Sequence, residues 1–321
     1  MRKTNMDTIR AEAFEITDSD GQVRIRITVD GNADAIVDLA DSSGAVRTRL
    51  RVGAEGASGI ELRGADGQMR SLLGAGATPD QAASLELLDG DGTSRVSVGA
   101  WSDGSASVAI SDQNGSRRLV GGTAPDGDAS VDMLDSAGAH RLSLTQPKSG
   151  PTGLMLWDPN GKLRALIAHG PEPDRSASVE FWDTDGAYRA GFGHWPNGAT
   201  GAELLDPRGT LRARLGERPD GATSVELSDR KGNFRVGLGQ WPNGAAGVEM
   251  WDSNNTNRAR LGVWDDGTSG LEVSDPRGTN RTRLGQRPDD STTLDFWDRD
   301  GTYSFGLGEG SSTSGGKVTK D

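Results

Sequence analysis

The sequence predicts an all-β protein built from about 13 tandem β-hairpin repeats of 23 residues. An Arg recurs every 23 residues from Arg24 to Arg281, apart from two intervals of 25, and Ser304 takes the thirteenth place. A Gly stands three residues before each of these positions, and an Asp three residues before the Gly, with Asn255 and Gly64 as the exceptions. Between these markers apolar and polar residues alternate with period 2, which is typical of strands and not of helices. We therefore expect each repeat to consist of strand, turn, strand and turn.

Composition points to a thin, repetitive structure. Only 58 of the 321 residues are Leu, Ile, Val or Phe, and the net charge is -12. Such a chain cannot build one thick core, so its order must come from repetition. The absence of Cys excludes disulfides and thiolate zinc sites. The acidic balance argues against a nucleic-acid partner, and no apolar run is long enough to insert into a membrane.

The turn sequences predict tight hairpins. The segment Asp206-Pro-Arg-Gly209 has the preferences of a type I turn, and Asp229 and Gly232 take the same places in the next repeat. Because Asn tolerates positive φ best after Gly, Asn255 predicts that the Gly column has positive φ. The second loop of each repeat is similar, as in Trp195-Pro-Asn-Gly198, and both two-residue insertions fall in such loops, at 75–83 and 170–177.

Alternation along the strands predicts one apolar and one charged face. In an antiparallel meander with Asp opposite Gly, acidic and basic residues face each other and form structural salt-bridge columns, and the second turn then needs a bulge. The members of these columns are Glu203 with Arg212, Glu226 with Arg235, and Glu249 with Arg258. A solenoid, which would stack the Arg side chains about 4.8 Å apart, and a propeller, which would bury both faces, are the alternatives.

A one-sided sheet must cover its apolar face. We expect symmetric self-association into an elongated β-prism rod, with a trimer as the favoured form. The repeats suggest one domain over 11–309, preceded by a short segment at 1–10 and followed by a flexible tail at 310–321. Residues 1–10 lack the apolar region of a secretory signal, so we expect a cytoplasmic protein, with a virion or signal-independent export as alternatives.

The repeated block LxLxDxxGxxRaxLG, which residues 11–308 match, resembles tandem β-repeats of uncharacterised bacterial proteins. The resemblance implies a β-repeat fold in a bacterial or phage protein and no known activity. The Asp-x-x-Gly hairpin is also similar to the tyrosine-aspartate shell repeats of toxins and to the choline-binding repeats of cell-wall proteins. Their Tyr columns are missing here, since the chain has only Tyr188 and Tyr303, so these two similarities concern the turn alone.

Residues that could support chemistry are sparse. The three His residues take unrelated positions in their repeats, so we expect no enzyme, no cofactor and no His metal site. Asp-x-Asp-Gly, as at 18–21, is similar to the start of a calcium loop, but its Gly comes too early and the Glu at position 12 is missing. An ordinary turn is the simpler interpretation, and calcium binding is the alternative.

The tryptophans are the candidate contacts for a ligand or partner. Four of them precede the turn Asp, namely Trp157, Trp182, Trp251 and Trp297, and others open the second loop, namely Trp195, Trp241 and Trp264, together with Trp101. Trp beside Arg on a sheet surface is typical of a stabilising cation–π contact. The sequence therefore favours a non-enzymatic structural or interaction protein, such as a fibre, spike or scaffold. The alternative is a multivalent carbohydrate-binding protein in which surface Trp residues are sugar platforms.

Overall fold

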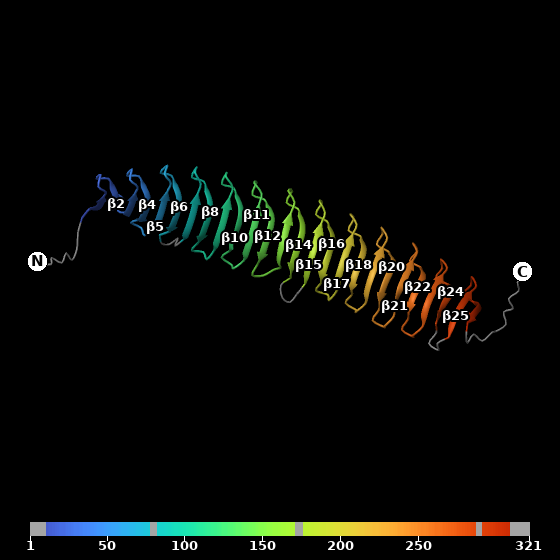
Figure 1. Ribbon diagram of the computed structural model, residues 1–321. Coiled ribbons are helices and arrows are strands. Elements are labelled where there is room, and N and C mark those ends of the chain that lie inside the picture. Colours follow the sequence, from blue (N-terminus) through green and yellow to red (C-terminus); the bar gives the residue numbers. More distant parts are fainter. Residues whose placement is uncertain (1–10, 78–81, 171–175, 287–290, 309–321) are drawn as a thin grey trace. The chain divides into compact units, whose positions relative to one another are not determined.

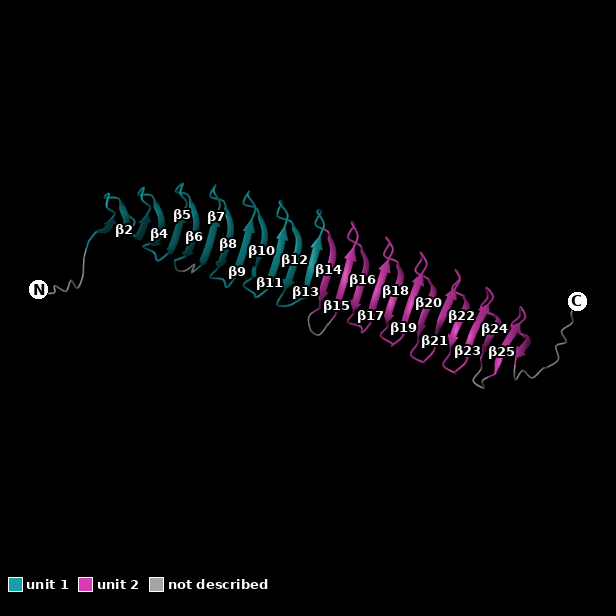
Figure 2. Cartoon of the chain, in the orientation of Figure 1, with its two compact units in different colours: residues 1–161 teal, residues 162–321 magenta. Residues whose placement is uncertain are grey.

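The computed structural model describes residues 11–308 except 78–81, 171–175 and 287–290 (Figure 1). The described residues form 26 strands joined by turns, without a helix, which confirms the predicted all-β hairpin repeat. The predicted segments at 1–10 and 310–321 lie outside the described residues. The contacts divide the chain into two compact units, residues 1–161 and 162–321 (Figure 2), although the repeat pattern continues across this boundary.

Unit 1 is a meander of 13 strands, in which every strand pairs antiparallel with the next one along the chain. Its strands are β1 (Ala13–Thr17), β2 (Val23–Val29), β3 (Ala35–Ala40), β4 (Val46–Val52), β5 (Ser58–Arg63), β6 (Met69–Ala75), β7 (Ala83–Leu88), β8 (Ser94–Ala100), β9 (Ala106–Ser111), β10 (Arg117–Thr123), β11 (Ala129–Leu134), β12 (His140–Gln146) and β13 (Thr152–Trp157).

Unit 2 has the same organisation, again with 13 strands that pair antiparallel in chain order. Its strands are β14 (Leu163–His169), β15 (Ala177–Trp182), β16 (Tyr188–His194), β17 (Thr200–Leu205), β18 (Leu211–Glu217), β19 (Thr223–Ser228), β20 (Phe234–Gln240), β21 (Ala246–Trp251), β22 (Asn257–Val263), β23 (Ser269–Ser274), β24 (Asn280–Gln286), β25 (Thr292–Trp297) and β26 (Tyr303–Gly308). The unbroken antiparallel pairing of 13 strands in each unit is that of a meander, whereas a solenoid would stack its coils in parallel and a propeller would divide the strands into four-stranded blades.

The Asp-x-x-Gly turns are organised by one carboxylate oxygen. The Gly209 N–H donates to the Asp206 carbonyl at 2.9 Å, and the Asp206 N–H donates to the Thr210 carbonyl at 2.9 Å. Oδ1 of Asp206 accepts from the N–H groups of Arg208 at 2.9 Å and of Thr210 at 3.1 Å. The turn is completed by Gly209 at φ +78°. Asp229 and Gly232 repeat this arrangement, and Asn255 at φ +58° confirms that the column requires positive φ.

The register of the first hairpin differs from the expected one. Leu205 pairs with Leu211, but Leu204 pairs with Ala213, so Arg212 is an extra, bulged residue. Glu203 therefore lies opposite Arg214 and not opposite Arg212. The bulge lies after the first turn, whereas β18 and β19 pair across the second turn without a shift in register. The expectation of a bulge at the second turn was wrong because the first turn closes with Asp206 opposite Thr210 and is followed by the extra residue Arg212, so the apolar faces already match across the second turn.

The same shift moves the other two predicted columns. Glu226 lies opposite Arg214 and Gly237 instead of Arg235, and Glu249 lies opposite Gly237 and Arg260 instead of Arg258. The charged rows do exist, but other Arg residues form them. The Arg214 guanidinium contacts Glu203 at 2.5 Å, and that of Arg260 contacts Glu272 at 2.9 Å.

The bulged Arg column connects each hairpin to the next one. Nε of Arg212 donates to the Ser228 carbonyl at 2.9 Å, and Nε of Arg258 donates to the Ser274 carbonyl at 2.9 Å. The guanidinium of Arg258 also contacts the turn carboxylate of its own hairpin, Asp252, at 3.3 Å. Arg235 likewise contacts its own turn carboxylate, Asp229, and reaches the next hairpin at the carbonyl of the turn residue Asp252. The recurring Arg therefore fixes the spacing of successive hairpins, which explains its strict period.

The two faces of each sheet differ in an unusual way. The apolar face carries two rows along the sheet, one through Leu204 and Ala213 and the other through Ala202 and Leu215. Its large side chains are the exposed ones, as in Leu204, Leu215 and many equivalents. The charged face carries Glu203 and Arg214, and the most buried side chains of unit 2, Thr293 and Asp295 at 2% exposure, lie in its rows. Each unit is thus a single layer in which the side chains of the charged face are the more buried and the large side chains of the apolar face are the more exposed.

The turn carboxylates predict sensitivity to acid. Backbone N–H groups of Gln22 and Asp20 lower the pKa of Asp18. Burial raises the pKa of Asp229, but hydrogen bonds from the N–H groups of Lys231 and Asn233 and from the side chains of Asn233 and Arg235 outweigh it and bring the pKa to about 2, from an ordinary 3.8. A folded pKa below the unfolded one stabilises the hairpin above pH 3.8, and this contribution is lost as the pH falls to about 2.

We therefore expect the melting temperature, followed by far-UV circular dichroism, to be constant from pH 7 to 5 and to fall steeply between pH 4 and 2. Other turn carboxylates whose pKa is lowered by the same kind of backbone N–H contact should add to this loss, among them Asp89, Asp112, Asp135, Asp183, Asp206 and Asp275. Sodium chloride at matched ionic strength controls for salt effects. An unchanged melting temperature at pH 2 would contradict this role of the turn Asp.

Candidate functional site

The tryptophans that precede the turn Asp pack against neighbouring aromatic rings. Trp182 and Tyr188 meet edge to face with ring centroids 6.0 Å apart, and Trp251 meets Phe234 in the same way at 6.1 Å. Trp297 contacts Tyr303 at 6.1 Å and Trp157 contacts His140 at 6.0 Å. All four indoles are half-buried. These four predicted contact residues therefore lie in packing contacts at the turn end of the charged face.

The tryptophans that open the second loops are placed by the turn itself. The Trp241 N–H donates to the Ala245 carbonyl at 2.8 Å, and its carbonyl accepts from Gly244 N–H at 2.9 Å. Trp264 closes its turn in the same way with Thr268 and Gly267. Trp195 is half-buried like these two, while Trp101 is 44% exposed. Trp241 and Trp264 open consecutive second loops, on the two sides of the β21–β22 hairpin.

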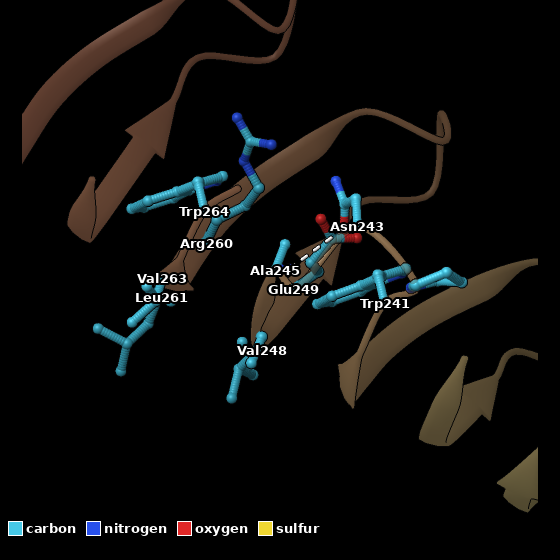
Figure 3. A pocket seen from close by; sticks show the side chains of 13 residues that line it. Trp241, Asn243, Ala245, Val248, Glu249, Arg260, Leu261, Val263 and Trp264 are labelled. Carbon is cyan, nitrogen blue, oxygen red and sulfur yellow. Dashed lines mark hydrogen bonds between the residues drawn. The ribbon is translucent and has the colours of Figure 1, made fainter. Parts of the chain in front are cut away.

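A pocket of about 440 Å³ lies between these two indoles. Figure 3 shows Trp241 and Trp264 on opposite sides of Glu249, whereas Val248 and Leu261 point the other way, to the apolar face. Pro242 and Asn243 form one rim of the pocket, and Oδ1 of Asn243 accepts the N–H of Ala245 at 3.2 Å. Glu249 also lines a second cavity of about 410 Å³ on the same face, next to Arg218 and Trp251.

The floor of the pocket is made of glycine. Gly247 and Gly262 pair across β21 and β22, and both line the pocket. A Cβ on Gly262 would lie 2.5 Å from the Ala246 carbonyl oxygen, and a Cβ on Gly247 would lie 2.5 Å from that of Leu261. The backbones approach too closely here for any other residue. The Gly columns therefore produce an open floor between the two indoles.

Charged groups hold one side of the pocket in place. The guanidinium groups of Arg260 and Arg283 lie 5.8 and 5.7 Å from the Trp264 ring centroid, within cation–π range. Arg260 is also anchored by Glu272. Glu249 accepts a hydrogen bond from Nε1 of Trp251 at 3.2 Å through one of its two carboxylate oxygens. The pocket thus combines two aromatic walls with one acidic and one basic group.

The polar atoms of the other candidate sites already have hydrogen-bond or ion-pair partners nearby. Oδ1 of Asp18, in the Asp-x-Asp-Gly turn, accepts two backbone N–H groups at 3.0 Å. Nδ1 of His140 lies 3.3 Å from Asp132, and that of His194 lies 3.0 Å from the Thr200 hydroxyl. In the part of the chain that the structure describes, no three His, Cys, Asp or Glu residues gather as a metal site would require. The same residues include no helix that could span a membrane.

Sequence reasoning identified Trp241, Trp264 and Glu249 separately but did not bring them together. Glu249 was predicted as a structural partner of Arg258, whereas it lines the pocket opposite Arg260. The sequence feature that could have predicted the pocket is the occurrence of a Trp in two successive second loops, each preceded by a residue of the Gly columns.

No protein-family model matches the chain, and no curated protein matches it either. Among solved structures, it is similar to the TCP domain of SAS-4 (dCPAP) of Drosophila melanogaster, solved in complex with a proline-rich motif of Ana2, at 12% identity and a TM-score of 0.29. That similarity covers 53% of this chain and 92% of the other. The Tc holotoxin pore of Photorhabdus luminescens is similar at 10% identity and a TM-score of 0.19, over 91% of this chain and 18% of the other.

Proposed function

We propose that the protein is a non-enzymatic structural or interaction protein that self-associates through its apolar face, with three chains as the expected number. The observation that carries the proposal is the exposure of this face. Large apolar side chains lie open along both rows of each unit, while the charged face is the more enclosed. An apolar surface of this extent marks an interaction site.

The area of the apolar face is sufficient for a stable interface. Thirteen strands about 4.8 Å apart make each unit about 60 Å long, and two rows of side chains span about 13 Å of strand. The product is about 800 Å² per unit, which is the area that a stable protein interface buries on each partner.

The pattern of residue sizes favours a second copy of the same chain as the occupant. Over β17–β22, large residues on odd-numbered strands alternate with smaller ones on even-numbered strands in the row through Leu204, namely Leu204, Ala213, Leu227, Val236, Met250 and Ala259. In the other row the even-numbered strands carry the larger residue, as in Ala202, Leu215, Val225 and Leu238. Two such surfaces can interdigitate, since the knobs of one copy meet the hollows of another.

Charge supports the same assignment. The two rows contain no charged residue in the described parts of either unit, so equal copies can meet without burying like charges. Three sheets with their apolar faces inward would form a prism, whose core the side chains of the two rows can fill. Chains held in this way would form a fibre, spike or scaffold.

Sedimentation equilibrium of the full chain tests this proposal. We expect a mass of three chains at micromolar concentration. Two chains would indicate a face-to-face sandwich and would still support self-association. A mass of one chain that persists to high concentration would overturn the proposal.

A further inference from the structure

We propose that the pocket between Trp241 and Trp264 binds a neutral, β-linked oligosaccharide, with a sugar ring between the two indoles and its hydroxyl groups on Glu249 and Arg260. The pocket lies on the charged face (Figure 3), so this inference is independent of self-association through the apolar face. Each of its elements follows from the contacts already described.

The pocket is preorganised for binding. Arg260 and Arg283 fix the Trp264 ring from the sheet, and the closed turn at Trp241 fixes the start of the opposite wall. The floor of Gly247 and Gly262 cannot be filled by side chains. Rigid aromatic walls reduce the entropy cost of binding, which matters for weakly bound ligands such as sugars.

The two indoles and the polar groups beside them indicate a sugar as the ligand. A pyranose presents apolar C–H faces and a rim of hydroxyl groups, so it needs flat apolar walls and a few acceptors and donors at its edge. The indoles provide the walls. The Glu249 carboxylate oxygen that Trp251 leaves open can accept from hydroxyl groups, and Arg260 can donate to them. One negative and one positive group together favour a neutral ligand.

Spacing favours a sugar over a flat aromatic ligand. The loops opened by Trp241 and Trp264 are two strand spacings apart, about 9.5 Å. A puckered pyranose is thicker than a planar base and suits this distance better. Extended chains of β-1,4-linked glucose or N-acetylglucosamine repeat every two sugar units, so a longer chain of this kind can continue along the face toward Arg218 and Trp195.

The test is titration of the full chain with cellohexaose, xylohexaose, chitohexaose and maltohexaose, followed by tryptophan fluorescence and calorimetry. We expect at least one β-linked hexaose to bind. Trp241→Ala and Trp264→Ala should each weaken binding about tenfold, and Trp264→Phe, which keeps a ring, should weaken it less. Glu249→Gln should also weaken binding, at unchanged melting temperature.

The matched control is Trp101→Ala. Trp101 opens the same loop of its repeat, but the loops before and after it open with Gly76 and Ala124, so it has no second indole to form a pocket. This variant should bind as the unchanged chain does. The inference is overturned if no β-linked hexaose binds, if Trp241→Ala binds as tightly as the unchanged chain, or if the Trp101 variant loses binding equally.

Discussion

The double substitution of Leu238 and Leu261 by Glu is expected to convert the assembled protein to single chains. Both residues lie in the row of the apolar face that includes Leu215, and their exposures are 54% and 56%. In an assembly these side chains would be buried against another copy, where an unpaired carboxylate is strongly disfavoured. Because they are exposed in the single chain, the hairpins themselves should fold. Sedimentation equilibrium should give the mass of one chain, with an unchanged far-UV circular dichroism spectrum.

The control for this prediction is Thr223→Glu. Thr223 lies on the same side of the sheet, but in the polar row next to Glu217 and Gln240 at the second-turn edge. The same charge there should leave the assembly intact. If the Thr223 variant dissociates as well, or if the double variant remains assembled, the apolar rows are not the interface.

Replacement of Gly262 by Ala is expected to destabilise unit 2 severely. The added Cβ would lie 2.5 Å from the Ala246 carbonyl oxygen and 3.1 Å from the Gly247 Cα. These are backbone atoms of a paired strand, so the methyl group cannot be accommodated without separating β21 from β22. Overpacking of this kind costs about 1–3 kcal/mol. Chemical denaturation followed by tryptophan fluorescence should show the loss.

The matched control is Gly74→Ala. Gly74 occupies the corresponding position in unit 1, but the nearest atom to an added Cβ is the Ser58 carbonyl oxygen at 3.7 Å, an ordinary contact. This variant should be nearly as stable as the unchanged chain. Equal losses in the two variants would show that general strand propensity, and not close approach of the backbones, requires the Gly column.

The turns could be predicted from local sequence because their chemistry is local. Asp206 organises its turn through N–H groups two and four residues further along, and Gly209 completes it with positive φ. All of these groups lie within five consecutive residues. The exchange of Gly for Asn at position 255 was therefore enough to predict the backbone conformation of the whole column.

The register could not be predicted in the same way. Arg212 is adjacent to the turn in sequence, and simple counting placed it opposite Glu203. In the structure it bulges out to reach the Ser228 carbonyl of the next hairpin, so Arg214 takes the place opposite Glu203. The partner that decides the bulge is 16 residues away, and no pattern within one hairpin indicates it.

The sequence by itself determined the repeat length, the turn types, the antiparallel hairpins and the division into an apolar and a charged face, because each depends on residues close together in one repeat. Only the tertiary structure decided which charges pair and which face is enclosed. It also placed Trp241, Trp264 and Glu249 around one pocket. These features depend on strand register, which the contact from Arg212 to the Ser228 carbonyl of the next hairpin helps to set, and on the close approach of paired strands, as at Gly247 and Gly262.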